Sequence, residues 1–218
     1  MSMTNLLIVG ARGQGKVILD CALSTKKYDN IAFMTTEISY GGVEGYQLLD
    51  QNNTPLEYIR DNFDEIVVGV GLNNPARVKV SEYFEKNGMK LATIIHPNAT
   101  VSKFSKIGKG TVIFANAVVN PFATVGKACI INTGAIVEHE CTLSDGVHMS
   151  PNSTIAGRVN VGRYTWLCMG SLVSHEVNIG ENVTVGAGAV VLSDVPNNVL
   201  VAGVPATIKK HYEPVESY

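Results

Sequence analysis

The feature that most constrains the fold is a six-residue repeat of aliphatic side chains across residues 95–191. Neither an amphipathic helix, with its period of about 3.6 residues, nor an ordinary strand, with its period of about 2, keeps a six-residue register over such a length. A period of six is typical of the hexapeptide β-helix. We therefore predict a left-handed parallel β-helix over this part of the chain. The seventeen aliphatic positions are Ile95, Val101, Ile107, Ile113, Val119, Val125, Ile131, Val137, Leu143, Met149, Ile155, Val161, Leu167, Val173, Ile179, Val185 and Val191.

In such a β-helix three hexads form one triangular coil, and each coil buries its apolar row only against its neighbours. We expect the aliphatic residue of each hexad to fill the interior. The residue four places later is always small or valine, and we expect it at the crowded inner corner. A third signal recurs every 18 residues, with Gly108, Gly126, Gly162 and Gly180 and with Ser144 in the one remaining place. We expect glycine to supply positive φ where the coil needs it.

The composition argues against several classes of protein. A formal net charge of −2 over 218 residues offers no basic field to nucleic acid. No apolar run reaches the length of a membrane span, and the first residues lack the basic start and cleavage site of a signal peptide. The four cysteines include no C-x-x-C pair, and Cys129 and Cys141 fall in the inward-facing small series. We expect buried thiols and a reducing cytoplasm.

Ahead of the repeat, short apolar runs alternate with segments of helical pattern, which predicts a small parallel α/β sheet. We expect an α/β domain at 1–94, followed by a β-helix domain with a C-terminal cap at 95–218. The turn-rich tail after Val195 predicts a cap that includes a short helix. Within the first domain the expected strands are 5–9, 31–34, 65–70 and 90–95, and the expected helices follow residue 15, span 55–62 and end at about residue 87.

The first expected strand ends in a glycine-rich turn, GARGQG, that leads into a helix. Backbone N–H groups at such a helix N-terminus face anions such as phosphates. Ligands of a parallel α/β sheet lie at the carboxyl ends of its strands, where the GLNN segment also falls. We therefore expect a substrate cleft at this edge. Its candidate residues are Gly10, Arg12, Gly13, Gln14, Gly15, Gly71 and Asn73.

A tight strand-to-helix turn without a ligand is the alternative interpretation of the glycine-rich segment. The spacing is G-x-x-G-x-G and not the G-x-G-x-x-G of dinucleotide-binding proteins. Thr35 and Thr36 also stand where a ribose-binding acid would follow the second strand. These departures weaken any dinucleotide interpretation.

Two histidines, His139 and His175, are candidates for chemistry. Each lies two residues after an aliphatic repeat position and directly before a glutamate, and they are 36 residues apart. Because this spacing equals two coils, they should project from one face about 10 Å apart. Gly157, one coil from each, leaves a gap in the row. Imidazole exchanges protons near neutral pH, so a His–Glu pair suits a general base. We expect His96 to be structural and His211 to be solvated.

The chain resembles the bacterial hexapeptide-repeat sugar acetyltransferases. This family includes sialic-acid O-acetyltransferases and enzymes that N-acetylate nucleotide-linked 4-amino sugars. The resemblance covers nearly the whole chain and rests on GARGQG, GLNN, NTGAIVEHEC, HMSPNSTIAG and AGVPA. It implies acetyl-CoA as co-substrate, a nucleotide-linked amino sugar as acceptor, no metal, and a homotrimer with active sites between subunits.

The resemblance also implies roles for single residues. It assigns the general base to His139 and makes Glu140 the carboxylate that holds the imidazole tautomer. His148, Met169 and Ala187 match positions that line the coenzyme A cleft of the family. A backbone N–H beside the thioester should stabilise the oxyanion. The amide of Gly157 is our candidate for this donor.

Several alternatives remain open at this stage. His175 and Glu176 have the same local pattern as the assigned pair, and only the resemblance favours His139. Cys141 could suggest a covalent acyl-enzyme, but its register points it into the prism, where thiols are usually inert. Carbonic anhydrases with this fold bind zinc through three histidines, two of them 36 residues apart. Gly180 stands at the third position here, so a zinc site would lack a ligand.

The sequence also departs from the family at the presumed sugar-nucleotide pocket. Gln14 replaces the histidine of the usual G-H-G, and the acidic pair that often follows the second strand is missing. We expect an acetyl-CoA-dependent N-acetyltransferase that acts on a nucleotide-linked amino sugar by direct attack. O-acetylation of a sialic-acid-like sugar and a non-catalytic sugar-nucleotide-binding protein are the alternatives.

Overall fold

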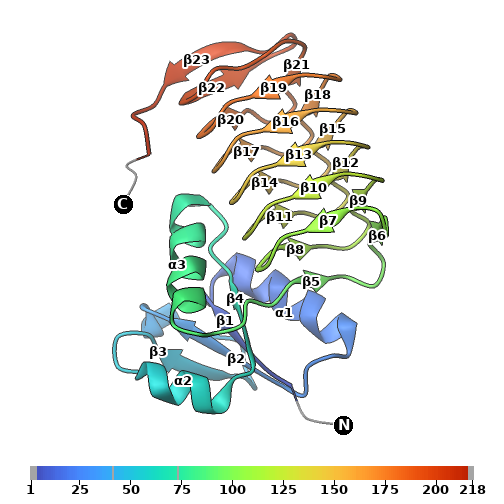
Figure 1. Cartoon of the computed structure of the whole chain (residues 1–218). Coiled ribbons are helices and arrows are strands. Elements are labelled where there is room, and N and C mark those ends of the chain that lie inside the picture. Colours follow the sequence, from blue (N-terminus) through green and yellow to red (C-terminus); the bar gives the residue numbers. More distant parts are fainter. Residues whose placement is uncertain (1–3, 41, 73, 216–218) are drawn as a thin grey trace.

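The computed structural model describes residues 4–40, 42–72 and 74–215, and it contains an α/β unit at one end of a long parallel β-helix (Figure 1). This is the fold class that the sequence predicts. None of the helices in the described part of the chain combines the length and the hydropathy that crossing a membrane would need.

The α/β unit is built on four parallel strands in the order β3-β2-β1-β4. Helix α1 packs on one face of this sheet, and α2 and α3 pack on the other, because successive residues of the central strand alternate between two apolar clusters. The elements are β1 (Asn5–Val9), α1 (Gly13–Thr25), β2 (Asn30–Thr35), a 3₁₀ turn (Ile38–Tyr40), β3 (Gln47–Asp50), α2 (Leu56–Asn62), β4 (Glu65–Val68) and α3 (Asn74–Lys86).

This unit differs from the prediction in two places. Strand β3 was not predicted, because its four residues QLLD are too few to show a pattern. The expected strand 90–95 is reduced to one bridge between Leu91 and Ile66. The next residues of that segment, β5 (Ile94–Ile95), pair with β8 (Val112–Ile113) instead. Because these residues already belong to the hexad repeat, they hydrogen-bond to the next coil of the β-helix and not to the α/β sheet.

The β-helix consists of two-residue parallel strands that alternate among three sheets of eight, six and five strands, the largest of which also includes the two longer strands of the tail. Paired residues are 18 apart, as Ile130 and His148 show, which confirms that three hexads make one coil. Besides β5 and β8 the strands are β6 (Thr100–Val101), β7 (Lys106–Ile107), β9 (Val118–Val119), β10 (Thr124–Val125), β11 (Ile130–Ile131), β12 (Ile136–Val137), β13 (Thr142–Leu143), β14 (His148–Met149), β15 (Thr154–Ile155), β16 (Asn160–Val161), β17 (Trp166–Leu167), β18 (Leu172–Val173), β19 (Asn178–Ile179), β20 (Thr184–Val185) and β21 (Val190–Val191).

The interior of the prism is filled as the repeat predicts. One apolar cluster runs from Ile113 to Val201 and contains the aliphatic series together with alanine, cysteine and valine from the small series. Glycine supplies positive φ within the coils, as at Gly110 and Gly170, but the period-18 glycines are not among these residues. The period-18 glycines are required because the next coil packs too closely against them to leave room for a side chain. A Cβ on Gly162 would lie 2.4 Å from the backbone nitrogen of Glu181 in the next coil.

Both ends of the β-helix are covered. At the first coils, α1 packs on the outer face of the eight-stranded sheet, where Val112, Phe114 and Ile130 join its apolar cluster. At the other end, β22 (Val199–Ala202) and β23 (Thr207–His211) form an antiparallel pair that extends the same sheet. The tail therefore forms a β-hairpin where we expected a short helix, because β22 continues the hydrogen-bond ladder of β20.

Candidate active site

The His139–Glu140 pair lies at the corner where the six-stranded sheet passes into the five-stranded sheet, between β12 and β13. Glu140 has a φ of 59°, and this left-handed turn places its side chain beside the preceding one. His139 Nδ1 lies 3.1 Å from Glu140 Oε2. Because a carboxylate only accepts hydrogen bonds, Nδ1 carries the proton and Nε2 keeps a lone pair. About half of the His139 side chain is exposed to solvent.

Gly157 occupies the same corner one coil further on. A Cβ at this position would lie 2.5 Å from His139 Cε1 and 2.6 Å from Nε2. The gap in the histidine row is therefore filled by the imidazole of His139, and only glycine leaves room for it. Gly157 itself is buried against this ring.

His175 and Glu176 do not form a second pair of this kind. Arg158 binds the Glu176 carboxylate through Nε at 2.9 Å and Nη2 at 2.7 Å. The same guanidinium lies 3.8 Å from Glu140. Sequence reasoning missed Arg158, although the alternation of charge at positions 140, 158 and 176 recurs with the 18-residue period and could have revealed it.

His148 lies on β14 and is buried, with a relative exposure of 5%. Its Nδ1 lies 3.0 Å from the carbonyl oxygen of Gly71, and its ring stacks on Trp166 with 6.0 Å between centroids. Burial, and then the charge of Arg77, lower the pKa of His148 to about 4. The imidazole is therefore neutral at physiological pH. The resemblance implies that His148 lines the coenzyme A cleft with Met169 and Ala187. The structure instead places its ring at the loop that follows β4, beside the predicted substrate cleft.

The glycine-rich turn at 10–15 packs closely against the ends of β2 and β4. The Gly10 N–H donates to the carbonyl of Met34 at 2.7 Å, and a Cβ on Gly15 would lie 1.9 Å from the Gly10 carbonyl oxygen. Gln14 reaches the second predicted segment, since its Cβ would lie 3.2 Å from a Cβ on Gly71.

Three further residues of the predicted cleft have different surroundings. The exposed side chain of Arg12 pairs with Glu37, which lies just beyond the two threonines after β2. Gly13 begins α1 and has open space where a Cβ would be. Asn73 lies outside the described residues. The structure therefore brings Gln14, Gly71 and His148 together, whereas Arg12 points to the surface.

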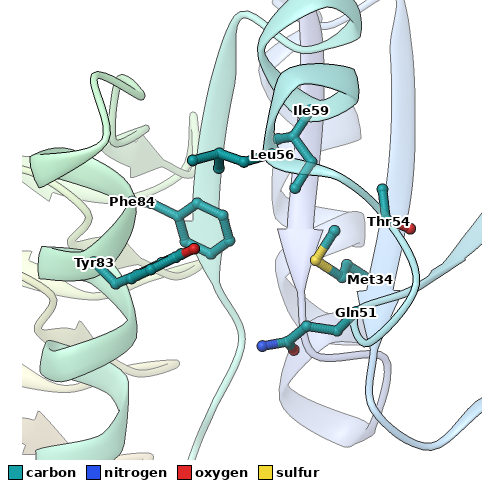
Figure 2. A pocket seen from close by; sticks show the side chains of 7 residues that line it. All are labelled: Met34, Gln51, Thr54, Leu56, Ile59, Tyr83 and Phe84. Carbon is teal, nitrogen blue, oxygen red and sulfur yellow. The ribbon is translucent and has the colours of Figure 1, made fainter.

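A pocket of about 150 Å³ opens on the other side of the same edge, between α2 and α3 (Figure 2). Its wall begins at Met34, whose carbonyl binds the Gly10 N–H, so the pocket adjoins the glycine-rich turn. Apolar side chains form most of its lining, and an amide and two hydroxyl groups add polarity. The lining residues are Met34, Gln51, Thr54, Leu56, Ile59, Tyr83 and Phe84.

Met169 and Ala187 lie at a different corner from His139. Both follow strands of the eight-stranded sheet and precede strands of the six-stranded sheet, and the Gly188 N–H donates to the Met169 carbonyl at 3.0 Å. Met169 is 59% exposed. The whole width of the six-stranded face, roughly 15–20 Å, separates this corner from the His139 corner. One chain therefore does not bring the two predicted parts of the site together.

Neither the covalent nor the metal alternative gains support. Cys141 is fully buried, its Sγ lies 3.1 Å from the Ala156 carbonyl, and burial raises the pKa of its thiol. A thiol held protonated in the interior is a poor nucleophile. Among the residues that the structure describes, no group of three or more His, Cys, Asp or Glu side chains could hold a metal ion.

Comparisons with known proteins agree with this architecture. Residues 5–84 match the family described as the PglD N-terminal domain. A mutant of perosamine N-acetyltransferase from Caulobacter crescentus, in complex with CoA and GDP-perosamine, is 32% identical with a TM-score of 0.90, over 96% of this chain and 98% of that one. The acetyltransferase domain of PglB from Neisseria gonorrhoeae, in complex with acetyl coenzyme A, is 34% identical with a TM-score of 0.87, over 95% and 100%.

A more distant solved structure, WeeI from Acinetobacter baumannii, shares the fold at 23% identity and a TM-score of 0.72, over 95% of this chain and 100% of that one. A search among curated proteins found no match.

Proposed function

Since the chain belongs to the family of PglD-like bacterial sugar acetyltransferases, we propose that it transfers the acetyl group of acetyl-CoA to the amino group of a nucleotide-linked amino sugar. The observation that carries this proposal is the His139–Glu140 pair, with its Nδ1 bound to the carboxylate and its ring seated over Gly157. The perosamine N-acetyltransferase mutant and the PglB domain hold coenzyme A and acetyl coenzyme A respectively, and the former also holds a nucleotide-linked amino sugar.

The transfer proceeds by direct attack. The sugar amine adds to the thioester carbonyl carbon while His139 Nε2 accepts the proton that the nitrogen loses, and the tetrahedral intermediate then expels the coenzyme A thiolate. A positioned general base contributes about 10²–10⁴-fold in rate. The backbone N–H of Gly157 is our candidate donor to the oxyanion, a contact worth about 3–4 kcal/mol where such donors have been removed.

The two parts of the chain divide the substrates between them. We assign residues 1–94 to the sugar nucleotide and residues 95–218 to the acyl transfer. The glycine-rich turn faces the phosphates through backbone N–H groups at the start of α1. The pocket beside Met34 takes the base, because a cavity of about 150 Å³ holds a single six-membered ring.

The active site is completed by a second subunit. His139 stands at one corner of the prism, and the positions assigned to coenzyme A, Met169 and Ala187, stand at another. A homotrimer of prisms placed side by side would bring the His139 corner of one chain to the coenzyme A corner of the next. Because two different corners meet, the interface is heterologous, and such an interface closes into a ring of cyclic symmetry.

The test is release of coenzyme A thiol, followed with Ellman's reagent, over a panel of nucleotide amino sugars that carry uracil or guanine. We expect thiol release that depends on the acceptor, and a product whose acetyl group survives mild alkali, as an amide does. An alkali-labile product would indicate O-acetylation. Binding of an amino-sugar nucleotide without thiol release would indicate a non-catalytic binding protein.

A further inference from the structure

Arg77, on α3, is the largest of the fully buried side chains, with a relative exposure of 1%. Its hydrogen bonds go to four backbone carbonyls and one side-chain amide, and to no carboxylate among the described residues. Burial lowers its pKa to about 10, which still leaves it charged at neutral pH. A buried cation that binds only carbonyl oxygens is costly, so its position requires an explanation beyond packing.

The bonds of this guanidinium join two parts of the molecule. Nε donates to the Ala128 carbonyl at 2.7 Å and Nη2 to the Gly146 carbonyl at 2.8 Å, which are equivalent positions in successive coils. Nη1 donates to the Val70 carbonyl and to Asn74 Oδ1, both at 2.9 Å, in the loop after β4. Arg77 therefore ties this loop to the corner of the β-helix beside which α3 lies (Figure 1).

The same guanidinium reaches the carbonyl that orients His148. Arg77 Nη1 lies 3.3 Å from the Gly71 oxygen, and His148 Nδ1 lies 3.0 Å from it. A carbonyl only accepts hydrogen bonds, so His148 must carry its proton on Nδ1. Its Nε2 is then an acceptor, and this buried atom has no hydrogen-bond partner among the described residues. Gln14 also packs on Gly71, and its side-chain amide nitrogen is a buried donor that likewise has no hydrogen-bond partner among the described residues.

We propose that Arg77 is a positioning residue of the acceptor site: by holding the Gly71 carbonyl it keeps His148 in the Nδ1–H tautomer and turns Nε2 toward the acceptor. This inference rests on the proposed function. A sugar hydroxyl can donate to His148 Nε2 or accept from the Gln14 amide, and either contact would satisfy a buried polar atom that has no partner among the described residues. The positive charge of Arg77 also disfavours a second proton on His148.

Nitrogen-15 NMR of the full-length protein, labelled on histidine, tests the proposal without any substrate. In the wild type we expect His148 to show a protonated Nδ1 and an unprotonated Nε2 at neutral pH. Arg77→Lys keeps the charge but cannot span the loop and two coils, so His148 should exchange between tautomers. Glu85→Gln is the matched control, because Glu85 also joins α3 to the β-helix, through Lys109 and Lys127, without touching the loop.

Kinetics then separate positioning from a general structural role. We expect Arg77→Lys to raise the KM for the acceptor about tenfold, the loss typical of one buried polar contact, and to leave the KM for acetyl-CoA unchanged. If Arg77→Lys does not fold, Asn74→Ala takes its place. This variant removes the Asn74 Oδ1 that accepts from Arg77 Nη1, and also the hydrogen bond that Asn74 donates to the Tyr164 carbonyl at 2.9 Å. We expect the same shifts in milder form.

An unchanged His148 tautomer in a folded Arg77→Lys or Asn74→Ala protein would overturn the proposal. So would an equal effect of Glu85→Gln on the His148 signals. If the wild type transfers no acetyl group to any acceptor, the proposed function fails, while the NMR measurement still decides whether Arg77 sets the tautomer.

Discussion

At the scale of single residues, the proton on His139 is held on the Glu140 side, so only Nε2 can take a proton from an attacking amine. We expect His139→Ala to lower kcat by about a hundredfold or more, as loss of a general base does, and to leave the fold intact. The control is His175→Ala, since its glutamate neighbour is bound by Arg158. If His175→Ala inactivates the enzyme and His139→Ala does not, the wrong pair has been chosen.

Gly157 gives a second expectation at this scale. Its φ is not positive, so alanine suits the backbone, but the added Cβ would lie 2.5 Å from the His139 ring. The ring can rotate away at little cost in stability, yet displacement of a catalytic group by about 1 Å can cost as much as a hundredfold in rate. Gly157→Ala should therefore lower kcat at least tenfold, on the same grounds, while thermal unfolding shows little change. Full activity would mean that the observed seat of the imidazole is not used in catalysis.

At the scale of the element, two kinds of glycine in the coils should respond differently to alanine. A Cβ on Gly162 would meet the backbone of the next coil at 2.4 Å, whereas Gly170 has open space but a φ of 65°. Gly162→Ala should cost about 3 kcal/mol or more, because rigid backbone cannot yield. Gly170→Ala should cost only about 1–2 kcal/mol, the penalty of a left-handed residue. Urea denaturation measures both, and equal midpoints would contradict this distinction.

The same element shows how far the sequence alone can predict this protein. The hexad register, the inward series and the placement of His139 followed from local periodicity, because each coil repeats the geometry of the last. The hairpin at the tail and the strand at 47–50 lie outside the repeat and could not be read from it. The contact of His148 with Gly71 depends on how the α/β unit docks, which spans 77 residues of sequence. Long-range docking of this kind leaves no periodic signal.

At the scale of the whole molecule, a site shared between subunits can be tested by mixing. Chains carrying His139→Ala and chains carrying Ala187→Trp, which blocks the assigned coenzyme A corner, should each be inactive alone. When equal amounts are refolded together as cyclic trimers, about a quarter of the sites should combine an intact His139 with an intact corner. Thiol release relative to the wild type measures this fraction. Recovery near zero would place both groups in one chain's own site.

The hydrogen bonds of the β-helix run along its axis, each joining one coil to the next, as between the Ser150 N–H and the Leu167 carbonyl at 2.9 Å. A force applied along that axis therefore loads the rungs one coil at a time and never all together. Each coil that opens frees 18 residues, or about 60 Å of slack chain. Pulled along its axis, the β-helix should therefore unfold coil by coil, at low force and in equal steps.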